Sequence, residues 1–325
     1  MDLIYAARYT EVCDYAWHDY SEAKNVVGQS LPSGIWHVDT TAIPQFFTTI
    51  QNMFNRNKKY VVVSPSCDYG ICLQRYNPPA LDLEKWVGLQ ITPQHGYNGI
   101  QMEPRCILEQ CNPADTYSIK CWSYTYATFD SIPENVVKWF VCNCDIEHSK
   151  VIAIPFGISG NKDQQEQAIR IDVARSIGDD PPRDKLLYVN FQFYTTDRYR
   201  LYKHFDSYFG DLVTCEQKVD FDTFLHRLAT HKFVLCPPGN GPDCYRTLEA
   251  LYMGAVPVLE QRRGCILPYL KGGGYPLVVY PNLFMCTPDG LNALNIADEW
   301  DLTNVMWPYW KNRILEAWES LRLQS

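Results

Sequence analysis

The stretch FVLCPPGNGPDCYRTLEALYMGAVPVLE, from Phe233 to Glu260, decides the fold that we predict for this chain. It reads as a short apolar strand, a loop with two glycines, a helix that Asp243 can cap, and a second apolar strand. Gly254 is expected to end the helix. Apolar runs and helical patterns alternate on both sides of the stretch, which is typical of a parallel, doubly wound sheet. We therefore predict an α/β protein built from two Rossmann-like doubly wound domains.

The other predicted elements follow from the spacing of apolar residues. In the second half we expect strands at 186–191, 212–215 and 277–280, and helices around 198–205 and 221–228. In the first half we expect strands at 60–63, 136–142 and 151–154, and a helix whose apolar face includes Phe46, Phe47, Ile50, Met53 and Phe54. A closing helix presents one apolar face, made of Trp307, Trp310, Ile314, Trp318 and Leu321.

The polar, proline-containing segment from Gly178 to Asp184 has no apolar periodicity and is the best candidate for a linker between domains. We therefore expect an N-terminal domain over residues 1–180, a C-terminal domain over 185–305 and the closing helix over 306–325. At 325 residues the chain is long enough for two domains of ordinary size, each with its own core.

Composition excludes some classes of function. The formal charge of -8 argues against a nucleic-acid partner, because binding to a polyanion needs an excess of Lys and Arg. Thirteen cysteines cannot all pair within one chain, and they include no C-x2-C pair, so we expect buried thiols and no metal site. No apolar run is long enough for a membrane span, and the start does not resemble a signal peptide. We expect a soluble, cytoplasmic protein, although a Golgi-luminal enzyme whose anchor lies outside this sequence would look similar.

The loop and helix after residue 236 form a candidate anion site. Gly239, Asn240 and Gly241 allow the backbone to approach a ligand closely, and a helix that begins near Asp243 directs free N–H groups toward it. Arg246, one turn into the helix, adds a planar set of donors suited to phosphate oxygens. The pattern is neither the dinucleotide fingerprint nor a Walker loop, because no third glycine and no Gly-Lys-Ser/Thr sequence follows.

Glu249 follows Arg246 by three residues on the same helical face. Its carboxylate can accept hydrogen bonds from ribose hydroxyls next to a bound diphosphate. The alternative is an ion pair between Arg246 and Glu249 on a solvated helix face, which would stabilise the helix by only about 0.2–0.5 kcal/mol. The residues alone leave both interpretations open.

The same stretch resembles the donor-binding signature of exostosin-like glycosyltransferases. The resemblance rests on Pro238-Gly239, Arg246, Glu249-Ala250-Leu251 and the strand that follows Gly254. It is nearest to the branch that contains β-xylosyltransferases and homologues in large DNA viruses, and the segments 60–68 and 139–157 of the first half are also similar to that branch. The resemblance implies a GT-B fold with two domains facing across a cleft, an inverting mechanism, a UDP-sugar donor and no catalytic metal. UDP-xylose is the donor that the branch favours.

An inverting transfer needs a base for the acceptor hydroxyl. Asp68 is our first candidate because it lies in a loop after a predicted strand, where open α/β sheets place ligands; its alternative role is to stabilise a turn. Glu260, directly after a strand, is the rival candidate, and His148 is a weaker one. Arg198 follows the 186–191 strand and is expected to add a second contact to the diphosphate.

Asp220-Phe221-Asp222 has the D-x-D form of a metal-binding motif, but it opens an amphipathic helix, so we interpret it as helix capping. The expected partners are a nucleotide-sugar donor, bound by the C-terminal domain, and an oligosaccharide or glycoprotein acceptor, bound by the N-terminal domain. Two alternatives remain open: a noncatalytic glycan- or nucleotide-binding module on the same fold, and a sugar-nucleotide epimerase or hydrolase.

Overall fold

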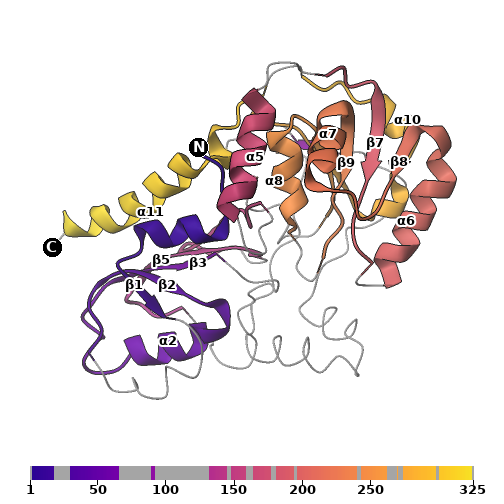
Figure 1. Cartoon of the computed structure of the whole chain (residues 1–325). Helices are drawn as coiled ribbons and strands as arrows, with labels where there is room; N and C mark the ends of the chain where they lie inside the picture. The colour runs from indigo at the N-terminus through magenta and orange to yellow at the C-terminus, as the bar shows by residue number, and fades with distance from the viewer. Residues whose placement is uncertain are drawn as a thin grey trace.

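The structure is a computed structural model of the chain, and it describes residues 2–17, 30–65, 89–91, 132–144, 148–158, 164–176, 181–193, 196–239, 243–261, 269, 274–297 and 300–323. These residues form an α/β protein with two sheets, and all the strand pairs within the sheets are parallel. In Figure 1 the first sheet lies at the lower left and the strands β7, β8 and β9 of the second lie at the upper right.

The first sheet has the strand order β1-β2-β3-β5-β6. Its strands are β1 (Tyr15–Trp17), β2 (Gly34–Val38), β3 (Tyr60–Ser64), β5 (Val136–Val141) and β6 (Val151–Ala153). Helix α2 (Ile43–Ile50) packs on one face, where the rings of Phe47 and Trp139 meet edge to face at 5.3 Å. Burial on both faces of a parallel sheet explains why β2, β3 and β5 read as nearly continuous apolar runs.

The second sheet has the strand order β4-β11-β10-β9-β7-β8. Its strands are β4 (Leu89–Ile91), β7 (Lys185–Val189), β8 (Val213–Cys215), β9 (His231–Leu235), β10 (Val256–Glu260) and β11 (Leu277–Tyr280). The chain leaves β7 toward β8 and returns to β9 on the other side of β7. The carboxyl ends of β7 and β9 therefore form a topological switch point, which is where open α/β sheets bind ligands.

Helices cover both faces of the second sheet. Side chains from α7 (Phe221–Thr230) and α8 (Tyr245–Tyr252) share one core with alternate sheet residues such as Tyr188 and Val234. Side chains from α6 (Thr196–Phe209) and α10 (Pro288–Asn292) share another core with the intervening residues, such as Leu187 and Leu235. This two-residue alternation is what a sheet buried on both faces requires.

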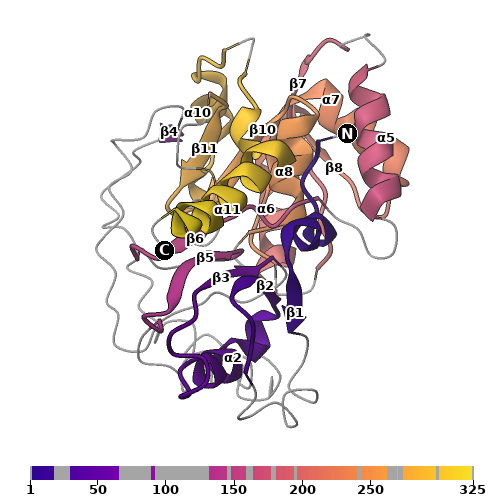
Figure 2. The same ribbon diagram turned by 90° about the vertical axis from the view of Figure 1, so that its left-hand side faces the viewer.

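Segments from opposite ends of the chain join the two sheets. The 3-10 helix η1 (Ala6–Val12) and the last helix, α11 (Trp307–Arg322), pack together, with the rings of Tyr9 and Trp307 edge to face at 5.3 Å. Helix α11 also contacts β3 and β5, whereas α5 (Gln164–Ser176) contacts α7 and α8. In Figures 1 and 2, α11 accordingly extends over the first sheet.

The structure confirms most of the predicted elements and corrects one. The strand at 60–63, the strands around the β9–α8 loop and the apolar face of the closing helix are present, and Gly254 follows α8 with a φ of 73°. The apolar face expected to continue through Met53 and Phe54 is wrong, because α2 ends at Ile50 and those side chains are 74% and 55% exposed. The buried residue after the helix is Asn55, whose side chain accepts a hydrogen bond from Leu31 N at 2.7 Å.

Two further observations concern the predicted organisation. Strand β4, from the first half of the sequence, pairs with β11 of the second sheet. Among the helices of the described residues, none combines the length and the apolar character needed to cross a membrane. The predicted domain limits stay predictions.

Candidate functional site

Arg198 organises the loop that follows β9. Its side chain is 6% exposed, and its Nε and Nη2 donate to the carbonyl oxygens of Pro238 and Pro237 at 2.8 and 3.1 Å. Its Nη1 donates to the carbonyl oxygen of Gln192, after β7, at 3.2 Å. Arg198 therefore joins the two loops of the switch point by main-chain contacts. Gly239 fits this arrangement, because an added Cβ would lie 3.1 Å from Nη2 of Arg198.

Arg246 lies at the start of α8, directly after this loop. Its guanidinium carbon lies 5.8 Å from the ring centroid of Phe224 on α7. Its Nε is buried without a hydrogen-bond partner, and no ion pair joins Arg246 to another residue of the described ranges. A buried donor without a partner is costly, and a ligand that supplies an acceptor removes the cost. The guanidinium is therefore available to an anion at the switch point.

Glu249 lies one turn further along α8 and is only 3% exposed. The sequence left open an Arg246–Glu249 pair on a solvated helix face. That alternative does not fit, because residues 247–252 of α8 are all buried and the face that carries Glu249 is not solvated. Glu249 stays a predicted contact for the ribose.

Asp243 does not cap α8, contrary to the sequence-based expectation. The N-cap residue is Cys244, and the Asp243 carboxylate accepts from Cys244 N at 2.8 Å, Tyr269 Oη at 2.9 Å and Phe156 N at 3.2 Å. Burial raises the pKa of this carboxyl group to about 8. Asp243 thus connects the start of α8 to the loop after β6, and its role is to position the helix.

Further contacts join the start of α8 to the first sheet. The side chain of Asn143, after β5, accepts a hydrogen bond from Asp243 N at 2.8 Å, and Asn143 itself has a φ of 50°. The ring of Phe156 stacks on that of Tyr245, the first residue of α8, at 4.6 Å. The end of α8 that carries Arg246 therefore faces the carboxyl ends of strands from both sheets.

The remaining predicted site residues differ in how the structure places them. Glu260 ends β10, whose Val258 pairs with Leu235 of β9, so Glu260 lies at the same edge of the sheet as the Pro237–Gly239 loop. Asp68, Asn240 and Gly241 lie outside the described residues. His148 accepts a hydrogen bond from Lys150 N at its Nδ1, at 3.1 Å, and burial lowers its pKa.

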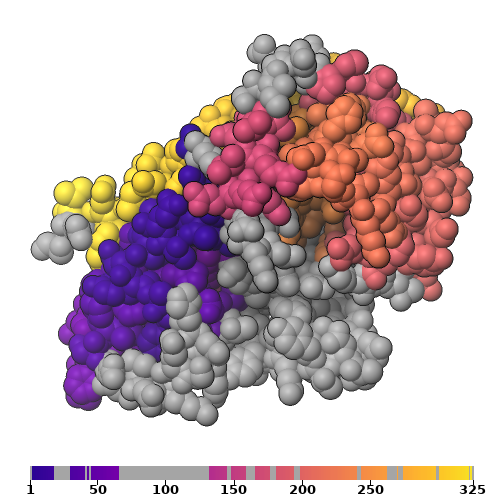
Figure 3. Space-filling view, in the orientation of Figure 1, coloured from indigo at the N-terminus to yellow at the C-terminus, as the bar shows by residue number. Residues whose placement is uncertain are grey.

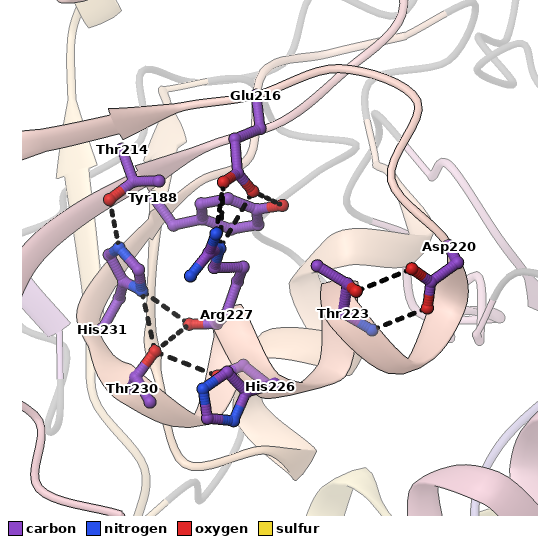
Figure 4. Close-up of polar contacts among 9 residues, drawn as sticks. All are labelled: Tyr188, Thr214, Glu216, Asp220, Thr223, His226, Arg227, Thr230 and His231. Atoms are coloured by element: carbon purple, nitrogen blue, oxygen red, sulfur yellow. Dashed lines mark hydrogen bonds and ion pairs between the residues drawn. The ribbon is translucent and has the colours of Figure 1, made fainter.

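A second polar cluster lies between β8, α7 and β9 (Figure 4). Arg227 binds Glu216 with both Nε and Nη2, at 3.0 and 2.6 Å, and this pairing lowers the pKa of Glu216. His231 is fully buried, with Nε2 2.8 Å from Thr214 Oγ1 and Nδ1 2.7 Å from the carbonyl oxygen of Arg227. The cluster satisfies its own charges.

Asp220 also belongs to this region, and its predicted capping role is confirmed. It is the N-cap of α7 and accepts from Thr223 N and Oγ1 at 2.9 and 2.6 Å. Asp222 forms an ion pair with Arg170 at 2.5 Å. The described residues contain no group of three or more His, Cys, Asp or Glu side chains that could hold a metal ion.

Two thiols next to Arg246 were not singled out from the sequence. Cys244 is the N-cap of α8, and its thiol interacts with that of Cys236, directly after β9. This interaction, together with the charges of Arg246 and Arg198, lowers the pKa of Cys244 to about 5 although burial opposes the shift. A cysteine two residues before an arginine at a helix start was the available signal.

Comparison with known families places this region in context. Residues 210–266 match the RXYLT1 C-terminal domain, a family of exostosin-like xylosyltransferases. This segment is similar to that domain. The matched residues run from the end of α6 through β10 and include the β9–α8 loop, Arg246, Glu249 and Glu260. No curated protein matches the chain.

Proposed function

We propose that the protein is an inverting, metal-independent glycosyltransferase that moves a sugar, with xylose as the favoured candidate, from a UDP-sugar to a glycan acceptor. The observation that carries the proposal is Arg246, which lies at a helix start at the topological switch point of the second sheet and whose buried Nε has no hydrogen-bond partner in the part of the chain that the structure describes. The similarity of residues 210–266 to a xylosyltransferase domain supports the same reaction class.

The proposed donor site uses groups that a diphosphate needs. The leaving UDP carries negative charge on its diphosphate, and fixed donors that face this charge lower the barrier to transfer. Arg246 supplies a planar guanidinium, and the first turn of α8 adds the partial positive charge of the helix. The N-cap residue of α8, Cys244, makes no side-chain hydrogen bond to the first turn, so its thiol does not compete with a diphosphate for the N–H groups there.

The proposed architecture is GT-B, with the donor on the second sheet and the acceptor on the first. Two parallel sheets, each with its own helices, are compatible with this assignment. The contacts of Asp243 with Asn143 and Phe156 hold the donor loop against loops of the first sheet. A sugar attached to a diphosphate at Arg246 would therefore lie near residues that can bind an acceptor.

Donor binding by the whole chain tests the proposal. Thermal-shift measurements with UDP, UDP-xylose and GDP, without added metal, should show stabilisation by the uridine nucleotides. Arg246→Ala should weaken UDP about 10- to 100-fold, because a hydrogen bond to a charged group contributes about 1.5–3 kcal/mol. The control is Arg170→Ala, which removes a solvent-exposed ion pair with Asp222 and should leave UDP binding unchanged. Equal UDP binding by wild type and Arg246→Ala would contradict the site.

Turnover separates an enzyme from a binding module. Wild-type protein should hydrolyse or transfer from UDP-xylose in the presence of EDTA. We propose Asp68 as the general base, with Glu260 as the rival, so Asp68→Asn should lower the rate by about 100-fold or more while UDP still binds. A normal rate in Asp68→Asn together with a loss in Glu260→Gln would move the base to Glu260. Loss of turnover on EDTA treatment would exclude the metal-independent mechanism.

A further inference from the structure

The turn after α2 exposes two neighbouring apolar side chains. Met53 and Phe54 are 74% and 55% exposed, although both are residue types that gain free energy when they leave water. Single exposed apolar residues are ordinary on a protein surface. Two adjacent ones at the tip of a turn form a compact apolar projection, which can insert into a partner.

Hydrogen bonds hold this turn in one conformation. Phe54 N donates to the side chain of Asn52 at 3.0 Å, and Asn55 N donates to the carbonyl oxygen of Asn52 at 3.0 Å. From the sheet side, the buried amide of Asn135 donates to the carbonyl oxygens of Ile50 and Asn55 at 2.7 and 3.3 Å. The turn is therefore anchored to the loop before β5, and it presents the two apolar side chains from a fixed base.

The amino ends of β3, β5 and β6 lie beside this turn and carry positive charge. Tyr60 N, at the start of β3, donates to the carbonyl oxygen of Asn135 at 2.9 Å, and β5 pairs in parallel with β6. The described residues at this edge of the sheet include two acidic residues, Glu134 and Asp14. The basic residues at the same edge are Arg56, Lys58, Lys59, Lys138 and Lys150. This edge is thus locally basic in a chain whose formal charge is -8.

The basic edge lies opposite the candidate donor site. The carboxyl ends of β5 and β6 lead to Asn143 and Phe156, which contact the start of α8. The amino ends of parallel strands lie at the other edge of the sheet. Figures 1 and 2 accordingly show α2 at the end of the molecule away from the second sheet. A partner bound at the turn would leave the β9–α8 loop uncovered.

We propose that the Met53–Phe54 turn and the basic residues around it, together called the basic tip, dock on a membrane surface that contains anionic lipids. Met53 and Phe54 enter the boundary between headgroups and acyl chains, while the exposed Arg56 and Lys59 stay at the level of the headgroups. A soluble polyanion would attract the basic residues but offers no apolar phase. A membrane surface accounts for both features, and the inference does not rest on the proposed function.

Flotation of the full chain with lipid vesicles tests the basic tip without any donor. The protein should bind vesicles made of equal parts phosphatidylcholine and phosphatidylserine, and bind phosphatidylcholine vesicles weakly. Met53→Ser and Phe54→Ser should each lower the partition coefficient about 10-fold, because each variant loses the burial of an apolar side chain. Arg56→Ser and Lys59→Ser should each lower it about 5-fold, and added salt should weaken binding further.

Matched variants separate the basic tip from exposed residues in general. Phe54→Trp should keep the binding of wild type, because tryptophan is favoured at membrane interfaces. Tyr208→Ser and Lys203→Ser replace an aromatic and a basic residue that are exposed on α6, and both should bind like wild type. All of these variants should melt close to the wild-type temperature, because the changed side chains are exposed.

The same measurements can overturn the proposal. Wild-type protein that fails to float with the anionic vesicles, or that binds neutral vesicles equally well, would contradict a docking site for anionic lipids. Wild-type binding by both Met53→Ser and Phe54→Ser would show that positive charge alone binds any polyanion. If light scattering shows a dimer that Phe54→Ser dissociates, and neither protein floats, the basic tip contacts a second copy of the chain instead.

Discussion

Arg227 and Arg246 lie on neighbouring helices, but their surroundings are opposite. Arg227, on α7, donates to both carboxylate oxygens of Glu216, and the Tyr188 hydroxyl donates to the same carboxylate at 3.4 Å (Figure 4). Arg246, at the start of α8, has a buried Nε with no partner and rests over the ring of Phe224. Both arginines belong to the segment that matches the xylosyltransferase domain.

The difference separates a stabilising role from a binding role. A guanidinium that is paired with a carboxylate inside the protein contributes to folding and gains little from a ligand. A guanidinium held in place but left without an acceptor gives up stability, and an anionic ligand can recover it. Figure 1 shows α7 and α8 side by side, so the two roles occur within one layer of helices, and this region belongs to the orange part of the surface in Figure 3.

The largest expected effect concerns Gly254. It packs against Arg183, which binds main-chain groups of α7, the helix of Arg227, and of the residue after α8, the helix of Arg246. Arg183 donates to the carbonyl oxygens of Leu228, in α7, and Met253, after α8, at 3.2 and 2.7 Å. Gly254 has a φ of 73°, and an added Cβ would overlap the Arg183 guanidinium. Gly254→Ala should lower the free energy of unfolding by about 2–4 kcal/mol, measured by urea denaturation.

Gly210→Ala is the matched control for this prediction. Its φ is 54°, but an added Cβ would meet no atom within 4 Å, so only the backbone strain remains. The expected loss is about 1 kcal/mol. Equal destabilisation by both substitutions would show that the Arg183 contacts do not hold the two helices.

An intermediate effect is expected for Arg227→Ala. Its ion pair with Glu216 is partly exposed, with side-chain exposures of 27% and 23%, so the loss of stability should be about 1–2 kcal/mol. UDP affinity should be unchanged at temperatures where the protein is folded. Arg246→Ala should show the reverse pattern. Its UDP binding should be weaker, and its free energy of unfolding should lie within about 0.5 kcal/mol of the wild-type value. If Arg227→Ala weakens UDP as much as Arg246→Ala does, the two regions are not functionally distinct.

A smaller effect is expected from pH. Burial lowers the pKa of His231 to about 4, so the folded state keeps this ring neutral while the unfolded state binds a proton below about pH 6.5. Stability from His231 is therefore complete above that pH and is lost as the pH falls toward 4. The buried carboxyl of Asp243, with its raised pKa, has the opposite effect between pH 8 and 4.

The contribution of His231 can be isolated by comparing variants. When the pH is lowered from 7.5 to 5.0, the urea midpoint should fall less in His231→Gln than in wild type, because only wild type can bind the extra proton on unfolding. His226→Gln, at an exposed site on α7, should behave like wild type. The same pH dependence in all three proteins would contradict a neutral, buried His231.

The sequence was informative wherever local rules decide the structure. Apolar runs predicted the strands around the candidate site, Asp220 was identified as a cap, and Gly254 as the end of α8. The prediction failed at Phe54, because helical spacing continued beyond the turn where α2 ends. Local spacing cannot show that Asn55 is the residue buried at that turn.

The arrangement of the candidate site depended on contacts between distant parts of the chain. Arg198 was expected at a phosphate but holds carbonyl groups of two loops, and Asp243 was expected to cap a helix but binds Phe156 and Tyr269. Charge and spacing identify such residues as important. Their partners, and hence their roles, are fixed only when the second sheet and the loops of the first come together.

We expect Arg246 to bind the diphosphate of a nucleotide-sugar donor, because its buried Nε has no hydrogen-bond partner among the described residues. Isothermal titration of UDP into wild type, Arg246→Ala and Arg227→Ala, at one ionic strength, tests it most directly. We expect equal affinities for wild type and Arg227→Ala, and an affinity about 10- to 100-fold weaker for Arg246→Ala. Undiminished UDP binding by folded Arg246→Ala would contradict it.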